Sequence, residues 1–403
     1  MRENILERDS YLIVLGAGSQ QVSAYKTASR LGLKTLAIDY NPKAKARDLA
    51  DKFLLASIKD KVECISKLKK LKLHYSGVTT IGVEVSPVVS AIAKEFNLSS
   101  VSETAAFNTT NKCARATVLQ KAGIPAPKFE IINERSLPKM INYPLIIKPS
   151  DNSGSRGVRI VGSEKEWFKA YDDAKSISGD GKVIVEELLQ GNEISIEGFV
   201  LDGKMIVVGF SDRNYISSYH PYFMEDGSSS PTNLPHSVVV EAEKVFAQAA
   251  YSLGVTEGPS KGDLIVTKEG VKVLEITSRL SPGFSLLLPH TEGTDPLEAT
   301  IRWAVNMHIP QSLLQAKFHK AMAHRFFFHQ PGKITKITGL ENLKKQPGVV
   351  EVVFLRDFTI GDILEPPNNI NRLFYIYTVA DNRDTAIRLA EEALSTVNIQ
   401  VDK

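Results

Sequence analysis

The sequence contains few of the residues that would indicate a redox, zinc or membrane protein. Only two cysteines occur in 403 residues, Cys64 and Cys113, far apart and without a CxxC pair, which is typical of unpaired thiols in a reducing compartment. The eight histidines show no HExxH or similar zinc spacing. No apolar run approaches the roughly 20 residues of a membrane span. The first residues, MRENILERDS, lack the apolar segment of a secretory signal. We therefore expect a cytoplasmic protein.

Charge and length further narrow the possible classes of protein. The formal net charge is +3, too small to indicate a nucleic-acid surface or a polybasic membrane patch. Hydrophobic residues at 43% and charged residues at 24% are typical of a globular protein. At 403 residues, the chain exceeds one typical core, and two or three domains are expected.

The N-terminal segment alternates strands and helices in the manner of a doubly wound α/β domain. The run 11–16, YLIVLG, predicts a buried parallel strand, and the helix that follows extends from a Ser19 cap to Gly32. A second strand ends at Asp39, about 20 residues after the glycines of the first turn, which is a dinucleotide-fold arrangement. A strand at 77–81 and a helix at 87–96 continue the alternation.

The glycine turn after the first strand has two interpretations. The pattern from Gly16 is GAGSQQ, so Gln21 stands where the third glycine of G-x-G-x-x-G belongs. A nicotinamide oxidoreductase would account only for this first part of the chain. We favour a tight turn whose helix amides face a small anionic substrate.

A second glycine-rich segment lies between two predicted strands. The strand 145–148 ends in Lys148, the loop 150–157 reads SDNSGSRG, and a strand at 158–161 follows. A strand–loop–strand lid with a lysine at its base can place backbone N–H groups and hydroxyls over a polyphosphate. It is not a Walker A loop, because the lysine precedes the glycines. A surface hairpin is the alternative.

Next comes a strand–hinge–strand unit. A strand at 182–187 leads into Leu188-Leu189-Gln190-Gly191, and a second strand runs from 193 to 200. Such a hinge offers one backbone carbonyl and one N–H to an adenine edge, and an acid a few residues later can hold ribose hydroxyls. Acids on a solvated strand edge are the alternative.

The segment 262–277, GDLIVTKEGVKVLEIT, predicts a β-hairpin with a three-residue turn at 268–270. If Thr267 sits opposite Val271, Asp263 sits opposite Glu275. Like charges at such a pair are destabilising, so either a cation lies between them or one is protonated. Two acidic oxygen ligands suit Mg²⁺, which binds through one or two carboxylates plus phosphates. A slipped register that sends one carboxylate to solvent is the alternative.

The order of these parts resembles the ATP-grasp superfamily, in its carboxylate–amine ligase branch. The similar pieces are NKCARATVLQKAGIPAPKF, YPLIIKPSDNSGSRGV, IVEELLQGNEISIEGFV and VLEITSRLSPGFS. They look most like the group of biotin carboxylase, glycinamide ribonucleotide synthetase and bacterial L-amino acid ligases. The resemblance implies an α/β fold in three parts: a doubly wound parallel-sheet domain at 1–107, an α+β ATP-grasp domain with a flexible lid at 108–314 (lid subdomain about 115–190), and a small C-terminal α+β domain at 315–403.

The resemblance also implies roles for individual residues. Lys112, at the start of a helix to about Ala122, and Lys148 would meet phosphates, and Arg279 would meet a transferred phosphate or the substrate carboxylate. Asp263 and Glu275 would hold Mg²⁺, with Mn²⁺ as a substitute. The remaining expected ATP contacts are Ser153, Gly154, Ser155 and Gly157 in the lid, Glu186, Glu187 and Leu189 at the hinge, and Glu193 at the ribose.

The sequence departs from the family pattern at three positions. Thr277 replaces the usual asparagine two residues after the second metal acid, so a third metal ligand is in doubt. Pro282 replaces a glycine often found after the arginine, and Asp263 is shorter than the common glutamate. None of these changes removes a charge needed to hold metal–nucleotide, so an active enzyme is expected.

The resemblance implies a ligase that activates a carboxylate as an acyl phosphate, releases ADP and joins the acyl group to an amine. The partners are therefore small-molecule carboxylates and amines, not nucleic acid or membrane, and a homodimer is a family expectation. A glycinamide ribonucleotide synthetase-type enzyme and a non-catalytic ATP-binding protein are the alternatives. The segment 211–236 is either a solvated loop or an acceptor pocket; the candidate substrate contacts are Arg213, Tyr219, His220 and Glu225, with Glu84 and His290 elsewhere.

Overall fold

The N-terminal part of the chain forms a small parallel sheet. The computed structural model describes residues 9–140 and 142–402. Strands β1 (Ser10–Leu15), β2 (Lys34–Asp39), β3 (Lys52–Leu55) and β4 (His74–Thr80) lie in the order β3-β2-β1-β4, all parallel. Helix α1 (Val22–Arg30) packs on one face, and α2 (Lys61–Leu71) and α3 (Ser86–Phe96) pack on the other. The predicted doubly wound arrangement is confirmed; β3 and α2 were not predicted.

The glycine turn after β1 is occupied by the protein's own side chains. Asp39 Oδ2 accepts a 2.8 Å hydrogen bond from the Ala17 N–H, and Gln21 Oε1 accepts one of 3.0 Å from the Gly18 N–H. Gly16 has a φ of +96°, and a Cβ on it would lie 3.2 Å from the Gln21 side chain. These two turn amides are therefore bonded within the protein, and the expectation that the helix amides face a small anion stays a prediction.

A second, four-stranded sheet carries the glycine-rich loop. Its strands β5 (Phe129–Ile132), β6 (Leu145–Pro149), β7 (Arg159–Val161) and β8 (Val183–Glu187) lie in the order β5-β8-β6-β7. Helix α6 (Glu164–Ser176) covers it with Trp167 and Tyr171, which are fully buried. Strands β6 and β7 pair antiparallel on either side of the loop, so the predicted strand–loop–strand unit is confirmed.

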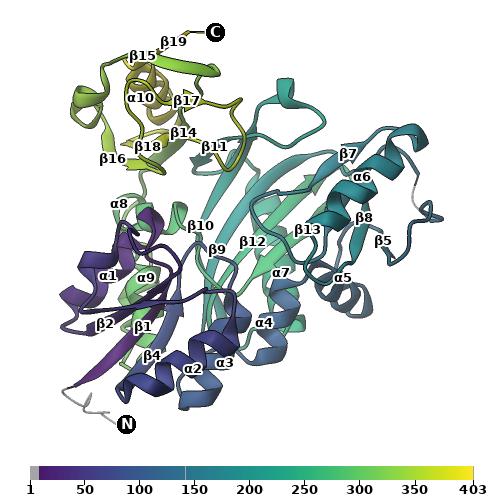
Figure 1. The fold of residues 1–403 in the computed structure, drawn as a ribbon. Helices are drawn as coiled ribbons and strands as arrows, with labels where there is room; N and C mark the ends of the chain where they lie inside the picture. Colours follow the sequence, from purple (N-terminus) through teal and green to yellow (C-terminus); the bar gives the residue numbers. More distant parts are fainter. Residues whose placement is uncertain (1–8, 141, 403) are drawn as a thin grey trace.

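The largest element is an eight-stranded sheet at the centre of the molecule (Figure 1). Its order is β13-β12-β9-β10-β11-β14-β18-β16. The strands are β9 (Asn192–Leu201), β10 (Lys204–Tyr215), β11 (Glu225–Ser230), β12 (Gly258–Thr267), β13 (Gly270–Thr277), β14 (Ala321–Phe326), β16 (Val349–Phe354) and β18 (Phe374–Ala380). The sheet runs through the predicted domain boundary at 314/315, because β14, β16 and β18 extend it beyond β11.

The two faces of this sheet differ in chemistry. On β9, Ile194 and Ile196 point into an apolar core with helix α7 (His236–Ser252). Because strand side chains alternate, Ser195 and Glu197 point to the opposite face. There helix α8 (Phe284–Thr291) packs against β10, β14 and β18. The polar residues of β9, β10 and β12 therefore share the face that α8 partly covers.

The segment 211–236 contains parts of two strands, which corrects its interpretation as one loop. Residues 211–215 end β10, 225–230 form β11, and only 216–224 connect them. The sequence of β11, EDGSSS, has low strand propensity, and pairing with β10 and β14 overrides it.

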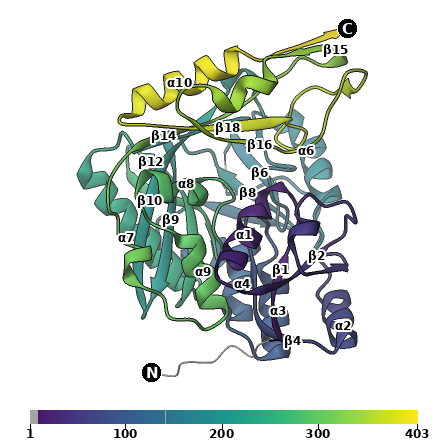
Figure 2. The ribbon, with the colours of Figure 1, turned by 90° about the vertical axis from the view of Figure 1, so that its left-hand side faces the viewer.

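Helix α9 (Pro296–Ala304) connects the central sheet to the N-terminal one. It contacts both α1 and β4, and Figure 2 shows it beside α1. Gly77 on β4 allows this approach, because a Cβ there would lie 2.4 Å from the Ala304 carbonyl oxygen. The N-terminal sheet is thereby held against the central one.

The C-terminal part closes with a small antiparallel sheet. It comprises β17 (Ile363–Leu364), β15 (Gly332–Thr338) and β19 (Asn398–Asp402) in that order. Asn382 caps helix α10 (Arg383–Ser395), and its side chain accepts a hydrogen bond from the Thr385 N–H. The strands and the helix of this part give it the expected α+β composition. None of the helices in residues 9–140 and 142–402 is long and apolar enough to cross a membrane.

Candidate active site

Lys112 is the first residue of helix α5 (Lys112–Lys121) and is almost fully buried. Asn111 caps the helix by accepting from the Ala114 N–H. The Lys112 N–H donates to the Ser150 carbonyl at 2.7 Å, and its ammonium donates to the Asn152 carbonyl. Burial lowers the pKa of Lys112 to about 8, an effect that nearby Glu275 partly offsets. The structure thus places a cation at the base of the glycine-rich loop.

Lys148 lies on β6 and points toward Glu186 on the neighbouring strand β8. Their Nζ and Oε2 atoms are 2.5 Å apart, and both side chains are almost buried. Glu187 accepts from the Lys128 N–H at 3.0 Å, and Leu189 follows in the hinge. Glu193, at the start of β9, accepts a 2.7 Å hydrogen bond from the Tyr215 hydroxyl. The expected nucleotide contacts therefore flank the hinge between β8 and β9.

The loop between β6 and β7 contains three residues with left-handed backbone. Gly154, Ser155 and Gly157 have φ values of +66°, +56° and +73°. Arg156 Nε donates to the Ser153 carbonyl at 3.0 Å within the loop. At its base, the Ile160 N–H donates to the Pro221 carbonyl at 3.0 Å, which joins β7 to the β10–β11 connection.

Asp263 and Glu275 do lie opposite each other on β12 and β13, but by a different register from the one predicted. Thr267 pairs with Gly270 rather than Val271, so the turn has two residues. The register then shifts between Asp263 and Leu264, which leaves Leu274 as an extra residue. This β-bulge restores the opposition of the two carboxylates, as bulges commonly re-aim a side chain beside an active site.

Protein cations compensate the opposed carboxylates. Asp263 Oδ2 contacts the Lys261 ammonium and lies 2.7 Å from Arg213 Nη1, and Oδ1 accepts from the Ser195 hydroxyl at 2.5 Å. Burial by itself raises the pKa of Asp263, but the charges of Arg213 and Lys261 outweigh it and hold the pKa well below its ordinary value. Asp263 is therefore ionised.

Glu275 is more accessible than its partner, with 31% of its side chain exposed. Arg115 Nη2 lies 3.6 Å from its Oε1. Burial opposes ionisation, but Arg115 and Lys261 together lower the pKa of Glu275. Both carboxylates are thus ionised, and neither a proton nor a bound metal is needed to explain their approach.

The pair nevertheless fits one divalent cation. Two carboxylate oxygens accept about four hydrogen bonds or metal bonds, and Asp263 uses three of these positions. One position on Asp263 and the exposed oxygens of Glu275 remain for a hard cation that prefers oxygen ligands. No group of three or more His, Cys, Asp or Glu side chains suited to a metal occurs among residues 9–140 and 142–402.

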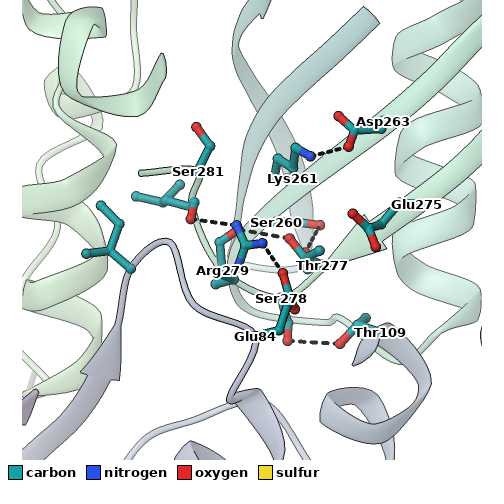
Figure 3. A network of polar contacts seen from close by, with 12 residues as sticks. Glu84, Thr109, Ser260, Lys261, Asp263, Glu275, Thr277, Ser278, Arg279 and Ser281 are labelled. Atoms are coloured by element: carbon teal, nitrogen blue, oxygen red, sulfur yellow. Dashed lines mark hydrogen bonds and ion pairs between the residues drawn. The ribbon is translucent and has the colours of Figure 1, made fainter. Parts of the chain in front are cut away.

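Arg279 lies in the loop between β13 and α8 and forms an ion pair with Glu84 (Figure 3). Glu84 follows β4, at the carboxyl end of the N-terminal parallel sheet, where open α/β sheets bind ligands. Burial lowers the pKa of Arg279 to about 10, so the side chain stays charged at neutral pH. Gly82 lets the two loops meet, because a Cβ on it would lie 2.5 Å from the Pro282 side chain.

Two buried charged residues of this face were missed by the sequence interpretation, namely Lys261 and Glu197. Lys261 opposes Glu197 on β9 and Thr277 on β13. Strand alternation supplied the signal: Lys261 is two residues before Asp263, and Glu197 is four after Glu193. Arg213, predicted as a substrate contact, instead bridges Asp263 and Glu225.

The other candidate substrate residues are spread more widely. Tyr219 and His220 lie in the connection between β10 and β11, and the ring of Tyr219 lies tilted against Phe328, with centroids 6.5 Å apart. His290 is exposed near the end of α8. Thr277 donates its hydroxyl to the Arg279 carbonyl at 3.2 Å, so its side chain holds the loop that carries Arg279.

Family comparisons match two parts of the chain. Residues 141–283 match the ATP-grasp domain, and residues 325–402 match the L-amino acid ligase C-terminal domain 2. A phosphoribosylamine–glycine ligase from Caldanaerobacter subterraneus is 30% identical over 269 residues, which are 60% of this chain and 64% of that protein. The chain spans half the length of the corresponding Methanococcus vannielii ligase.

Solved structures resemble nearly the whole chain. An L-amino acid ligase from Bacillus licheniformis aligns with a TM-score of 0.84 and 20% identity, covering 98% of this chain and all of the other. A phosphoribosylglycinamide synthetase from Anaerococcus prevotii aligns with a TM-score of 0.76 at 20% identity, with the same coverage. At such low identity these likenesses establish the fold.

Proposed function

We propose that this chain is a member of the ATP-grasp superfamily, in its carboxylate–amine ligase branch, and that its carboxylate substrate is a free amino acid. In this proposal ATP activates the amino acid as an acyl phosphate, and a second small amine receives the acyl group. The proposal rests on the resemblance to L-amino acid ligase in both fold and C-terminal family.

The Arg279–Glu84 pair is the observation that carries the choice of an amino acid. It joins two loops from different parts of the chain beside the Asp263–Glu275 pair. Both side chains are mostly buried, at 11% and 15% exposed. An amino acid is a zwitterion, so Glu84 would receive its ammonium group and Arg279 its carboxylate. Arginine suits this role because its planar fork binds carboxylates in a fixed geometry.

The chemistry comprises two transfers. A carboxylate oxygen attacks the γ-phosphorus of ATP, the bond to the β,γ-bridging oxygen breaks, and ADP leaves. The amine nitrogen then attacks the acyl carbon, loses a proton, and inorganic phosphate departs with the bonding electrons of the acyl–oxygen bond. Lys112, Lys148 and Arg279 would offset charge on the phosphates, because phosphoryl transfer depends mainly on positioning and charge neutralisation.

Asp263 and Glu275 would hold Mg²⁺, or Mn²⁺ in its place, and the bound metal would neutralise charge on the β- and γ-phosphates. The loop at 150–157 would cover the nucleotide and exclude water from the acyl phosphate. Lys112 links this loop to the site, because its ammonium already donates to the Asn152 carbonyl. Glu193 and the hinge at 187–189 would hold the nucleoside.

The test is ADP release with Mg·ATP, screened over pools of L-amino acids with Glu275→Ala as the blank. We expect one pool to raise ADP release and the blank to lose at least about a hundredfold in rate, roughly 3 kcal/mol. Glu269→Ala is the matched control: it removes a carboxylate from the same hairpin, at its exposed turn. That variant should retain full activity.

Two outcomes would contradict the proposal. ADP release that requires phosphoribosylamine as the amine and glycine as the acid would identify a phosphoribosylamine–glycine ligase instead. In that case no other amino acid should support ADP release. Tight Mg·ATP binding without ADP release in any pool would favour a non-catalytic ATP-binding protein. Replacing Glu84 by Gln should impair either ligase, since glycine also carries an ammonium group, so the two ligases are separated by whether ADP release requires phosphoribosylamine.

A further inference from the structure

The four-stranded sheet of the expected lid ends in an edge strand that contacts another part of the chain. Strand β7 lies at the edge of this sheet, and its outer side meets the connection between β10 and β11, residues 216–224, which we call the strap. The Ile160 N–H donates to the Pro221 carbonyl of the strap at 3.0 Å. The Arg159 guanidinium lies over the Tyr222 ring, 5.8 Å from its centroid. Because an edge strand offers N–H groups for pairing, the strap is a docking edge for the lid.

The docking is weak enough to open. A single hydrogen bond and an exposed cation–π contact each contribute little to stability, and 58% of Tyr222 is exposed to solvent. Segments held by so few contacts open locally without unfolding the rest of a protein. The lid can therefore leave the strap to admit a nucleotide and return to it afterwards.

The strap is longer than a simple turn and is held at both ends. Most β-hairpin connections have about two to five residues, whereas the strap extends from 216 to 224. At its start, Tyr215 donates its hydroxyl to Glu193, the expected ribose contact, and its ring meets the Phe223 ring edge-on, with centroids 6.1 Å apart. The strap therefore begins beside the expected nucleoside.

The C-terminal part of the chain holds the returning end of the strap. Asn369 Nδ2 donates to the Phe223 carbonyl at 2.6 Å, and its Oδ1 accepts from the Glu225 N–H at 3.3 Å. The buried Arg372 donates to the same Oδ1 and, at 2.6 Å, to the Glu225 carbonyl. The Asn369 side chain therefore joins the strap to a loop that precedes β18 in the C-terminal part.

We propose that Asn369 is a positioning residue of the active site, and that the C-terminal part sets how the lid closes by fixing the strap. With β7 docked on the strap, the loop at 150–157 is held over the acyl phosphate and keeps water from it. When the strap is displaced, water attacks the acyl carbon and loses a proton, phosphate departs with the bonding electrons, and the free amino acid is regenerated. The inference deepens the proposed function, because it rests on a nucleotide that binds under the lid.

The first test needs no nucleotide and no turnover. Asn369→Asp keeps the Oδ1 acceptor and removes the donor to the Phe223 carbonyl. Hydrogen exchange of the full chain, read by mass spectrometry with fragmentation, reports on the Ile160 amide. We expect this amide to exchange at least about tenfold faster in the variant, because the strap no longer holds the Pro221 carbonyl in place. The Val185 amide, on the inner strand β8, should exchange at the wild-type rate and shows that the variant is folded.

Asn342→Asp is the matched control, because it changes an exposed asparagine of the C-terminal part that lies outside this loop. Its Ile160 amide should exchange at the wild-type rate. A second measurement compares the ADP released with the amine consumed in the active amino acid pool. We expect about one ADP per amine in the wild type and at least about threefold more in Asn369→Asp, since water then reaches the acyl phosphate.

The outcomes separate this proposal from the proposed function. Unchanged Ile160 exchange in Asn369→Asp would overturn the proposal, and so would faster exchange with an unchanged ratio of ADP to amine. Faster exchange with no ADP release in any amino acid pool would support the docking of the lid on the strap and refute the ligase.

Discussion

At the scale of single residues, Glu197 is a buried acid whose charge is set by the fold. It is fully buried on β9, where Oε1 accepts from the Ser281 N–H at 3.0 Å. Burial raises the pKa of Glu197 to about 7, and the Ser281 hydrogen bond and Lys261 limit the rise. The carboxyl therefore loses its proton near neutral pH, next to the loop that carries Arg279.

This shift predicts a pH-dependent stability. The folded-state pKa lies above the ordinary value of 4.5, so the native state binds the proton more tightly than the unfolded state. The associated stability is fully present below the unfolded pKa and is lost as pH rises through about 7. Glu197→Gln should remove this pH-dependent loss. The free energy of unfolding of the variant should therefore rise, relative to that of the wild type, by roughly 2 kcal/mol from about pH 5 to pH 8. Urea unfolding at both pH values measures the difference.

A control variant should remove a carboxylate from another part of the protein. Glu243→Gln alters a half-buried acid on α7 and should give the same difference from wild type at both pH values. A Glu197→Gln difference that does not change with pH would show that Glu197 titrates as an ordinary carboxyl.

At the scale of elements, the glycines of the 150–157 loop define its shape. Gly157 has a φ of +73°, and a Cβ there would lie 2.6 Å from the Ile177 Cδ1 and 3.2 Å from the Pro149 ring. Pro149 ends β6 one residue after Lys148. The backbone at Gly157 therefore sets how the loop returns over the lysine.

Gly157→Ala should weaken nucleotide binding by displacing this loop. An alanine with left-handed backbone costs about 1–2 kcal/mol, and the added Cβ pushes against Pro149 and Ile177. Gly123→Ala is the control, since Gly123 has a φ of +67° and open space around its Cβ position. Both variants should lose stability on thermal unfolding, Gly157→Ala more because of its close contacts, but only Gly157→Ala should lower ADP affinity in calorimetry. Equal ADP affinities would mean that the loop does not contact the nucleotide.

At the scale of the whole molecule, the candidate substrate site is divided between two parts of the chain that are distant in sequence. Glu84 comes from the N-terminal sheet and Arg279 from the loop after β13. The Gly82 N–H donates to the Leu280 carbonyl, and Gly82 packs on Pro282. Helix α9, which contacts both α1 and β12, holds the two parts in this relation.

Gly82→Ala should therefore impair substrate use without affecting nucleotide binding. Its φ is +72°, and the new Cβ would meet the rigid Pro282 ring at 2.5 Å. Displacing Glu84 from Arg279 by about 1 Å can cost on the order of a hundredfold in kcat/KM. Gly32→Ala shares the left-handed backbone, with a φ of +73°, but has open space around it and should retain kcat/KM. A loss of ADP affinity in Gly82→Ala equal to its loss of kcat/KM would refute a separate substrate site.

Much of the fold could be predicted because its signals are local. The strand ending at Lys148, the helix capped by Asn111 and the hairpin carrying Asp263 all follow from apolar runs, caps and turns within a few residues. Strand β11 could not be predicted this way, because its serines and glycine form a strand only by pairing with β10 and β14. The opposition of Asp263 and Glu275 was predicted, but from a register that missed the bulge at Leu274.

The sequence by itself determined the alternation of strands and helices, the glycine-rich loop with its lysine, and the presence of two acids on one hairpin. These depend on residue types and spacing over short distances, which the chain carries wherever it folds. Only the tertiary structure decided which cations lie against those acids and that Glu84 meets Arg279. Such contacts join residues up to 195 positions apart. Their geometry depends on how the sheets pack, and no local pattern in the sequence specifies it.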